Sequence, residues 1–561
     1  MARWRLAVAL VLGLLVALPL AVPLLQLLAA PAAWGAWAQT GRPLALARNT
    51  ALLVAGTLAL SLPAGVAGAV LLYRTDLPLR RGLRLLVLLT LFVPLPLFTS
   101  GWQAVVGSGG WLPLALWNPP RPDEPASAAT GMAWAPWGQG IGSAVWAHAV
   151  AGLPWVILLV GQGLCWVERE LEEDALTAAG PWRVLWSVSL RRSAAAVAAA
   201  ALWVALQTGT EITVTDVMQV RTFAEEVYTQ FVVPEPSPGP GGAVARAVAV
   251  TLPVTLLTAV LVAALAWRWK RRLPPRATMV APPLLFPLGR WRWPAFAVTA
   301  AACVTLLALP LGSLVWRAGL HDSPPSWSAA VVVRALRSSA RADGAELLDS
   351  LLLAASAGAL CAVLALLACW LSVGARRFGA AVLILMAVAW ATPGPVVGLG
   401  LMGTIDRLLR LCGEWRPLAV ALWHGPSLLP LLWVDVLRFF PFAVAVLWPV
   451  VRLLPPELRD AARVDGARPG QELRYVVLPL TAPAVLRAAL VAAVLSLGEI
   501  SAGKLVSTPK KPGFAEVVFT QMHYGVTNHL ATQCLLLLAA VAAGGVLVLA
   551  AGRLAREGPP A

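Results

Sequence analysis

Apolar segments long enough to cross a bilayer recur along the whole chain, and this recurrence limits its fold more than any other feature. A membrane-spanning helix needs about 20 apolar residues, and the sequence holds about twelve such segments. They begin near Leu6, Thr50, Leu83, Ile141, Ser193, Val244, Pro294, Leu347, Phe378, Leu428, Thr481 and Ala531. Strands of a membrane barrel would be about ten residues long and would alternate in polarity. These continuous runs of Leu, Ala and Val instead predict an all-α integral membrane protein with about 12 transmembrane helices.

Composition and charge agree with a membrane protein. Hydrophobic residues make up 59% of the 561 residues and charged residues 12%, which excludes a soluble protein of ordinary make-up. Basic residues concentrate in cytoplasmic loops, and placing Arg3 and Arg5 inside puts most Lys and Arg on that side, so both termini are expected in the cytoplasm. The net charge of +16 is explained by loops that face anionic membrane lipid. It therefore does not predict a nucleic acid partner.

The first apolar segment leaves two interpretations open. Residues Arg3 to Ala30 combine a basic flank, an apolar run and small residues near the end, which also fits a cleaved secretory signal. The apolar part is nearer in length to a span than to a signal core. We therefore expect an uncleaved first helix.

A charged island from Pro455 to Leu480 separates two of the long apolar runs. Its arginines suit a cytoplasmic surface and not a bilayer. Glu457 to Val464 is expected to form a short helix, and Gly466 to end it, because glycine adopts the left-handed conformation of a tight helix exit. Pro469 suits the first turn of a second helix, which Pro479 is expected to close. The island predicts two short helices joined by a bend.

The run DAARVDGARPGQELRYVVLPL, from Asp460 onward, resembles the cytoplasmic signature loop of bacterial ABC importer permeases. That loop reads roughly EAA, three residues, Gly, nine residues, hydrophobic, any residue, Leu-Pro. The matching positions are Asp460, Ala461, Ala462, Gly466, Leu478 and Pro479, and Asp465 lies among them. An ordinary basic loop beside the membrane would explain the arginines alone, but it would not explain why the pattern occurs twice.

A weaker copy of the loop lies in the first half, where Glu172 opens EEDALTAAGPWRVLWSVSLRR. Ala178 stands where the glycine is expected and Arg191 where the proline is expected. Asp174, Ala175 and Gly180 belong to this copy. We expect both loops to contact the ATPase subunits that the resemblance implies.

Other short motifs repeat in the same order at a spacing of about 290 to 300 residues, as expected for duplicated halves. The resemblance implies two homologous six-helix halves related by a parallel pseudo-two-fold axis, as in type I ABC importer permeases. The expected divisions are 1–47 (first helix and periplasmic loop), 48–267 (first permease domain), 268–293 (basic cytoplasmic linker), 294–347 (helix and periplasmic loop), 348–552 (second permease domain) and 553–561 (cytoplasmic tail).

No motif in the sequence predicts an enzyme. GxSxG, HExxH and CxxC are absent, and the run Gly498 to Leu505 lacks the Ser or Thr of a phosphate-binding loop. We therefore expect no catalytic residues, no metal site and no cofactor on this chain. The resemblance implies two copies of a cytoplasmic ABC ATPase subunit, which carry ATP and Mg, and a periplasmic substrate-binding protein. It places the chain in a bacterial inner membrane.

Glu211 and Glu499 occupy equivalent helix ends in the two halves, with Asp216 nearby. An ionisable residue at membrane depth is costly and is a functional candidate, so these three residues are candidates for the translocation pathway. The alternative is that the glutamates lie at the water interface and cap neighbouring helices. Ionisable residues inside other spans, namely His148, Asp435, Arg438 and Arg487, are interpreted as satisfied bundle residues.

The prediction of the transported substrate rests on few residues. The runs Leu497 to Ser501 and Phe519 to Gly525, together with the fusion of both halves, resemble the ferric-iron branch of these importers. Fused permeases for thiamine are similar, and those for phosphonate or sulfate-like anions are related. Ferric iron is the first expectation and thiamine the second. A polytopic membrane enzyme or scaffold is the alternative from another class.

Overall fold

The fold is that of a computed structural model of the chain. It describes residues 1–37, 41–91, 93–106, 140–232, 242–272, 283–322, 325–413, 415–508, 511–522 and 527–554. Within these ranges the regular secondary structure is helical apart from one short antiparallel hairpin, β1 (Leu320–Asp322) with β2 (Pro325–Trp327), and an isolated bridge between Thr75 and Phe286. The expectation of an all-α protein is thus confirmed, with this hairpin of three paired positions as a minor addition.

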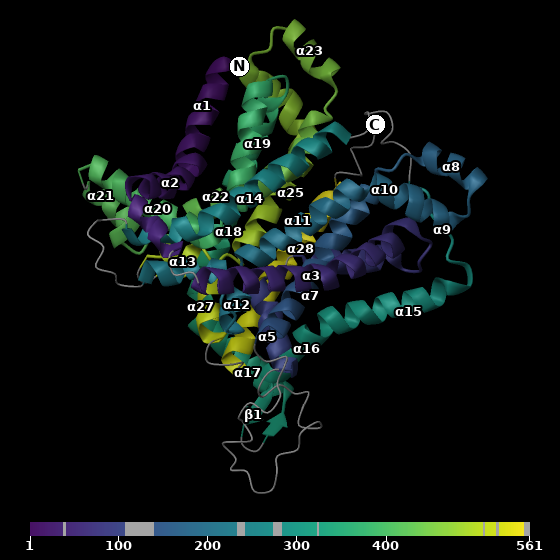
Figure 1. The fold of residues 1–561 in the computed structure, drawn as a ribbon, viewed down its shortest axis with the longest axis horizontal. Coiled ribbons are helices and arrows are strands. Elements are labelled where there is room, and N and C mark those ends of the chain that lie inside the picture. The colour runs from purple at the N-terminus through teal and green to yellow at the C-terminus, as the bar shows by residue number, and fades with distance from the viewer. Residues whose placement is uncertain are drawn as a thin grey trace.

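The helices of the first half follow one another from the N-terminus to the linker (Figure 1). They are α1 (Ala2–Leu12), a π-helical turn (Gly13–Ala17), α2 (Leu18–Ala29), a 3-10 helix (Pro31–Trp37), α3 (Gly41–Arg74), α4 (Arg80–Thr90), α5 (Leu95–Val106), α7 (Ile141–Cys165), α8 (Arg169–Ala178), α9 (Pro181–Val184), a π-helical turn (Leu185–Ser189), α10 (Leu190–Arg192), α11 (Ala194–Thr210), α12 (Thr213–Val217), α13 (Phe223–Val232) and α14 (Gly242–Arg272).

The elements of the second half run from the linker to the C-terminal helix. They are a 3-10 helix (Gly289–Trp291), α15 (Arg292–Cys303), a π-helical turn (Val304–Ala308), α16 (Leu309–Ala318), α17 (Ala329–Ala342), α18 (Gly344–Ser372), α19 (Arg376–Ala391), α20 (Gly394–Leu411), α21 (Arg416–Ala419), a π-helical turn (Val420–His424), α22 (Leu429–Arg452), α23 (Pro456–Val464), α24 (Pro469–Glu472), a π-helical turn (Leu473–Val477), α25 (Leu478–Ser496), α26 (Gly503–Val506), α27 (Phe514–Met522) and α28 (Asn528–Leu554).

Eight helices of the described chain are long and apolar enough to cross a membrane, and the number rises to 12 if each of four bent helix pairs is one span. The bent pairs are Arg80–Thr90 with Leu95–Val105, Pro181–Arg192 with Ala194–Thr210, Val244–Pro253 with Thr255–Leu261, and Arg376–Ala391 with Gly394–Leu411. All twelve expected segments therefore fall on helices, but four of them are broken. The sequence pattern did not predict these bends.

Several π-helical turns end two residues before a proline, as at Pro19, Pro310 and Pro479. Proline lacks an N–H group and clashes with the carbonyl four residues earlier, and a π-helical turn is one way to accommodate it within a helix. Pro479 therefore does not close the second loop helix, contrary to expectation. The helical path continues from Pro469 to Ser496 as one candidate span.

The first span of the chain packs on the second half. Val8 and Leu12 lie in one buried cluster with Cys361 and Leu437, and Gly400 of α20 allows close approach to Pro19 because a Cβ there would overlap the proline carbonyl. Figure 1 shows α1 beside α19. The packing therefore joins the predicted segment 1–47 to the second permease domain.

The first span of the second half packs on the first half in return. Phe296 and Cys303 of α15 pack against the buried cluster that contains Leu72, Tyr73 and Ile157. The start of this span therefore packs on the first half, whereas Leu314 and Ala318 near its end lie in a buried cluster with Phe519 of the second half. The predicted boundaries set 294–347 apart as a helix and periplasmic loop, and a one-dimensional hydropathy pattern does not show which helices it contacts.

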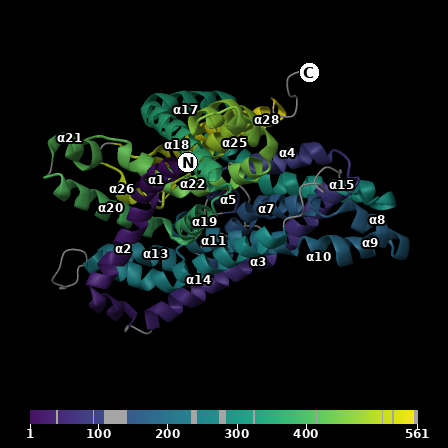
Figure 2. The same ribbon diagram turned by 90° about the horizontal axis from the view of Figure 1, so that it is seen from above.

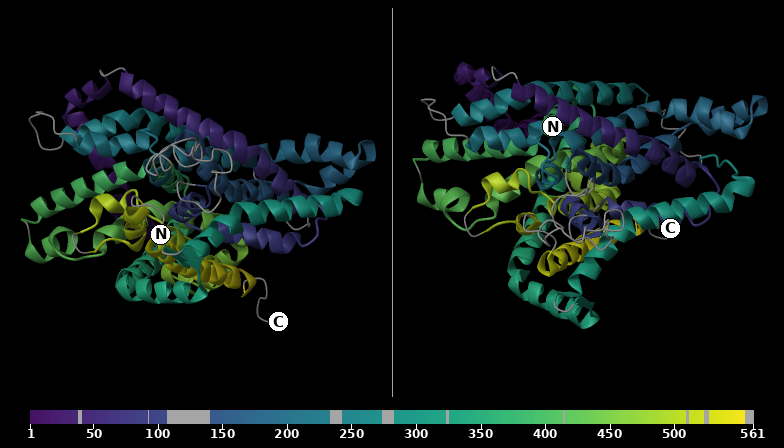
Figure 3. Two further views of the ribbon diagram at one scale, coloured as in Figure 1. Left: turned by 90° about the horizontal axis from the view of Figure 1, so that it is seen from below. Right: turned by 60° about the horizontal axis from the view of Figure 1, so that its bottom comes forward.

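Figures 2 and 3 show that α8, α9 and α10 project as an arm at one end of the molecule. In Figure 1, α23 lies near the N-terminus at the top, whereas β1 and α17 lie at the bottom. The two charged loops are therefore both remote from the hairpin.

Candidate functional site

The second-half loop has the predicted bend. Helix α23 is followed by Asp465 and by Gly466 at φ +78°. The Ala467 N–H donates to the Ala462 carbonyl at 2.9 Å, and the Gly466 N–H donates to Arg463 at 3.0 Å. These two bonds are the Schellman pattern, in which a left-handed glycine satisfies the last helix carbonyls. The prediction that Gly466 ends this helix in a left-handed conformation is confirmed.

A buried carboxylate fastens this loop to the helix bundle. Glu472 is 2% exposed and accepts bonds from Arg459 Nε at 2.7 Å, from Trp370 Nε1 at 3.2 Å and from Arg463 Nε at 3.4 Å. Trp370 belongs to α18, Arg459 and Arg463 to α23, and Glu472 to α24. Three elements are therefore tied together at the Glu472 carboxylate.

The first-half loop is fastened by a different buried pair. The Arg74 guanidinium at the end of α3 bonds to Glu172 of α8, and both side chains are fully buried. Ser189 Oγ also donates to Glu172 at 2.5 Å, and Arg74 donates to the Leu164 carbonyl at 2.8 Å. The linker covers this pair, because Phe286 lies 5.5 Å from the guanidinium. One arginine thus joins α3, α7, α8 and the linker.

The predicted loop residues differ in exposure. Asp174, Gly180, Asp460, Ala461, Asp465 and Gly466 are exposed, and Ala175 and Ala462 are half-buried. Glu172 lies inside, so it holds the loop in place and does not offer its carboxylate to a partner. Leu458 and Val464 of α23 are 46% and 87% exposed. The second loop therefore presents apolar side chains beside acidic ones.

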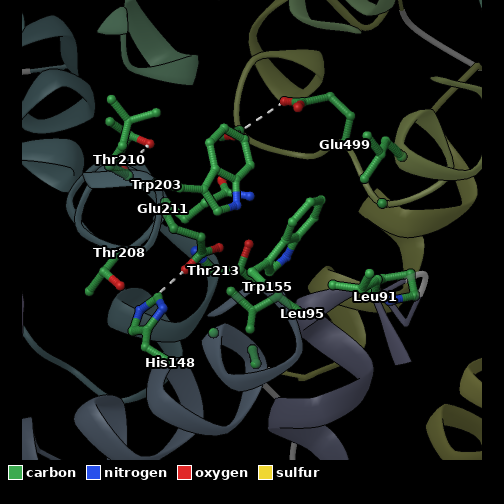
Figure 4. A pocket seen from close by; sticks show the side chains of 18 of the residues that line it. Leu91, Leu95, His148, Trp155, Trp203, Thr208, Thr210, Glu211, Thr213 and Glu499 are labelled. Atoms are coloured by element: carbon green, nitrogen blue, oxygen red, sulfur yellow. Dashed lines mark hydrogen bonds and ion pairs between the residues drawn. The ribbon is translucent and has the colours of Figure 1, made fainter. Parts of the chain in front are cut away.

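A cavity of about 210 Å³ lies between segments of the two halves (Figure 4). Its lining includes residues 90–91, 93–96 and 98 with 389–390, residues 148, 151–152 and 155 with 438–439 and 442, and residues 203–204, 206–208, 210–211 and 213 with 494–495 and 498–501. Glu211 and Glu499 both line it, as the sequence suggested. These segments come from both the N-terminal and the C-terminal half of the sequence, so the cavity lies between the two.

Both glutamates also cap the short helices that follow them. Glu211 accepts from the Thr213 and Val214 N–H groups at 2.6 and 2.9 Å, and Glu499 accepts from the Ala502 N–H at 2.8 Å. A glutamate can therefore cap a helix and line the cavity at the same time. Asp216 does not line the cavity. It lies near Glu225, whose pKa is raised by burial and then by the Asp216 charge.

The two carboxylates have different partners. Glu499 pairs with Arg438 Nε at 3.1 Å. The nearest basic group to Glu211 is His148 Nε2, at 3.8 Å, and this buried nitrogen has no hydrogen-bond partner among the described residues. Of the two cavity carboxylates, only Glu499 is thus paired with an arginine within the described structure.

Aromatic rings form much of the remaining wall. The Trp203 ring centroid lies 5.2 Å from those of Trp155 and Phe442 and 5.8 Å from that of Trp390. The indole nitrogens of Trp203 and Trp390 are buried without a hydrogen-bond partner in the described part of the chain. The cavity thus combines π faces, unsatisfied donors and carboxylates.

Sequence reasoning missed part of this site. His148 and Arg438 were interpreted as satisfied bundle residues, yet both line the cavity. That interpretation fits Asp435, which accepts from Ser496 at 2.5 Å, and Arg487, which bonds its own helix at Pro483. The three tryptophans stand in the middle of apolar runs, away from the ends where interfacial tryptophans gather. That position was the available signal, and 26 tryptophans in the chain obscured it.

The fold and site define a polytopic helical membrane protein with a cavity between two bundles. Residues 362–556 match the family of the binding-protein-dependent transport system inner membrane component. The chain is 37% identical over 71 residues to the inner membrane ABC transporter permease protein YdcU of Escherichia coli, covering 13% of this chain and 23% of the relative. It is 37% identical over 60 residues to the trehalose transport system permease protein SugB of Mycobacterium tuberculosis, covering 11% and 22%.

These alignments are short. The chain spans less than a quarter of the length of each of these curated relatives, whereas the family match extends through the second half and includes the loop at 455–480. The apolar helices and the matched inner membrane family together indicate an integral inner membrane protein.

Proposed function

We propose that the chain is the permease subunit of an ATP-driven ABC importer in a bacterial inner membrane. The observation that carries this proposal is the match of residues 362–556 to a binding-protein-dependent inner membrane component. The charged loop inside that region, with its buried anchor at Glu472, supports it. The chain would translocate a solute delivered by a periplasmic binding protein and would hydrolyse no ATP itself.

The loops would act as rigid levers. Two cytoplasmic ATPase subunits, holding ATP and Mg, would bind α8 with its neighbours and α23 with its neighbours. Each lever is tied to the bundle by a buried ion pair, Arg74 with Glu172 or Arg459 with Glu472. Movement of a bound ATPase would therefore reach the spans without being absorbed by a flexible segment.

The proposed topology has twelve spans in two homologous six-helix halves, with both termini in the cytoplasm. The first turn of the chain supports placing the N-terminus on the loop side, because the Trp4 ring lies 6.0 Å from Trp370 and Arg5 donates to the Leu371 carbonyl at 3.3 Å. The hairpin and α17 would then face the periplasm and the binding protein. The domain boundaries given above remain part of this proposal.

The cargo is proposed to be positively charged, because two carboxylates line the cavity. Ferric iron is the first candidate from sequence resemblance, and carboxylates suit a hard cation. Thiamine, an organic cation, is the second candidate, and the aromatic wall around Trp203 favours it. Phosphonate and sulfate-like anions fit a cavity with two carboxylates less well.

Purification in mild detergent tests the function. An ABC ATPase subunit is expected to co-purify, and its ATP hydrolysis is expected to rise when a loaded binding protein is added. Gly466→Asp is expected to leave the protein inserted in the membrane but to uncouple transport from hydrolysis. A membrane enzyme or scaffold would show no such partner. Normal uptake by the Gly466→Asp variant at normal expression would contradict the coupling role.

A further inference from the structure

The cavity between the halves has a lining that favours one chemical class of cargo. We propose that it binds a small organic cation, with the faces of Trp155, Trp203 and Trp390 against the cation and Glu211 as its counter-charge. This inference rests on the proposed function and deepens it. Transport through the cavity does not by itself explain why tryptophans cluster in its wall. The inference explains this cluster as part of a binding site.

The aromatic geometry is the first step. Trp203 is the centre of the cluster, 5.2 Å from Trp155, 5.2 Å from Phe442 and 5.8 Å from Trp390. A cation held within about 6 Å of an aromatic ring centroid is attracted by the negative face of the ring, most strongly for tryptophan. Rings from α7, α11, α19 and α22 meet here, so the wall is built by both halves.

The charge distribution is the second step. Arg438 already pairs with Glu499 at 3.1 Å. Glu211 has no lysine or arginine partner in the described structure, and a buried histidine such as His148 is ordinarily uncharged. A cationic group in the cavity would therefore meet one uncompensated carboxylate. Figure 4 shows Glu211, Glu499, Trp155 and Trp203 gathered around the same space.

Unsatisfied polar atoms are the third step. His148 is 4% exposed, and its Nε2 has no hydrogen-bond partner among the described residues. The buried indole nitrogens of Trp203 and Trp390 lack one as well. Buried donors without partners are uncommon and call for an acceptor. A ligand that carries hydrogen-bond acceptors beside its cationic group would satisfy them.

A bare metal ion fits this lining less well. Hard cations are bound by several oxygen ligands, and the described residues contain no group of three or more His, Cys, Asp or Glu placed to hold a metal. A metal ion would also leave the aromatic faces and the indole donors without a role.

The test is equilibrium dialysis of the full chain in lipid nanodiscs against radiolabelled thiamine, with tetraethylammonium as competitor and labelled ferric citrate in parallel. We expect saturable thiamine binding that tetraethylammonium displaces. Glu211→Gln and Trp203→Leu are each expected to weaken it at least about tenfold, with Trp203→Phe retaining more affinity than Trp203→Leu. Asp406→Asn removes a carboxylate from an exposed pair with Arg410, outside the cavity, and should change nothing.

Binding of ferric citrate without binding of either organic cation would overturn the inference, as would thiamine binding that neither cavity variant weakens. Neither result depends on an ATPase or a binding protein. Failure of the cargo class is thereby distinguished from failure of the importer function, which co-purification of the ATPase tests separately.

Discussion

The two charged loops are fastened to the bundle by chemically similar but positionally unrelated groups. In the first half a single fully buried pair, Arg74 with Glu172, does this. In the second half Glu472 shares its charge among Arg459, Arg463 and Trp370. The comparison shows that each loop has a buried anchor, and that the anchoring carboxylate lies at the start of the first loop and in the second helix of the other.

The two loops also turn differently. Gly466 adopts φ +78° at the end of α23. Gly180 has φ −66° and begins α9 in an extended conformation that any residue can adopt. Only the second loop therefore depends on glycine for its bend.

The largest expected loss of stability comes from breaking the buried pair of Arg74 and Glu172. Arg74→Met leaves the Glu172 carboxylate buried without its cation, which typically costs about 3–5 kcal/mol. Unfolding by sodium dodecyl sulfate in mixed micelles measures this loss. The double variant Arg74→Met with Glu172→Gln should recover part of the stability. A loss below about 1 kcal/mol would show that this pair is not an anchor.

The anchor at Glu472, which has several partners, should tolerate the loss of one arginine better. Arg459→Met leaves Glu472 with Trp370 and Arg463, so we expect a loss of about 1–3 kcal/mol in the same unfolding measurement. Arg463, whose side chain is 51% exposed, is the matched control, and Arg463→Met should cost about 1 kcal/mol or less. An Arg459 effect equal to that of Arg74 would remove the distinction between the two anchors.

Replacing the glycines at the turns should cost less stability. Gly466→Ala places a side chain in the left-handed region at a cost of about 1–2 kcal/mol, and it should reduce the ATP hydrolysis stimulated by loaded binding protein. Gly180→Ala is the control, because a Cβ there meets nothing within 4 Å. Equal losses for both variants would contradict the difference between the bends.

The smallest effect on stability is expected at the exposed acids. Asp460 pairs with Arg463 at the surface, and Asp174 is exposed. Asp460→Asn and Asp174→Asn should each change the unfolding free energy by about 0.5 kcal/mol or less. Any defect should appear in binding of the ATPase subunit, measured by pull-down. A stability loss above about 1 kcal/mol would place these carboxylates in the anchors.

Local rules predicted the loops well. A proline-rich start, the acidic Glu457 in the first turn and Asp465-Gly466 at the end were enough to place α23 and its bend. The apolar runs likewise predicted where the helices lie, because hydropathy depends on neighbouring residues alone.

Long-range packing could not be predicted in this way. Glu172 and Arg74 are 98 positions apart in the sequence, and nothing local indicates that they meet. The packing of the opening spans and the clustering of Trp155, Trp203 and Trp390 likewise depend on which helices become neighbours. The expectation that Pro479 ends a helix was wrong because a π-helical turn accommodates it.

Photo-crosslinking from the two loops in native membranes tests the central claim most directly. A photoreactive residue at Ala461 or Ala175 is expected to form an adduct with an ABC ATPase subunit, identified by mass spectrometry, whereas one at Trp327 on the hairpin is not. ATPase adducts at Trp327 and none at either loop would contradict the account.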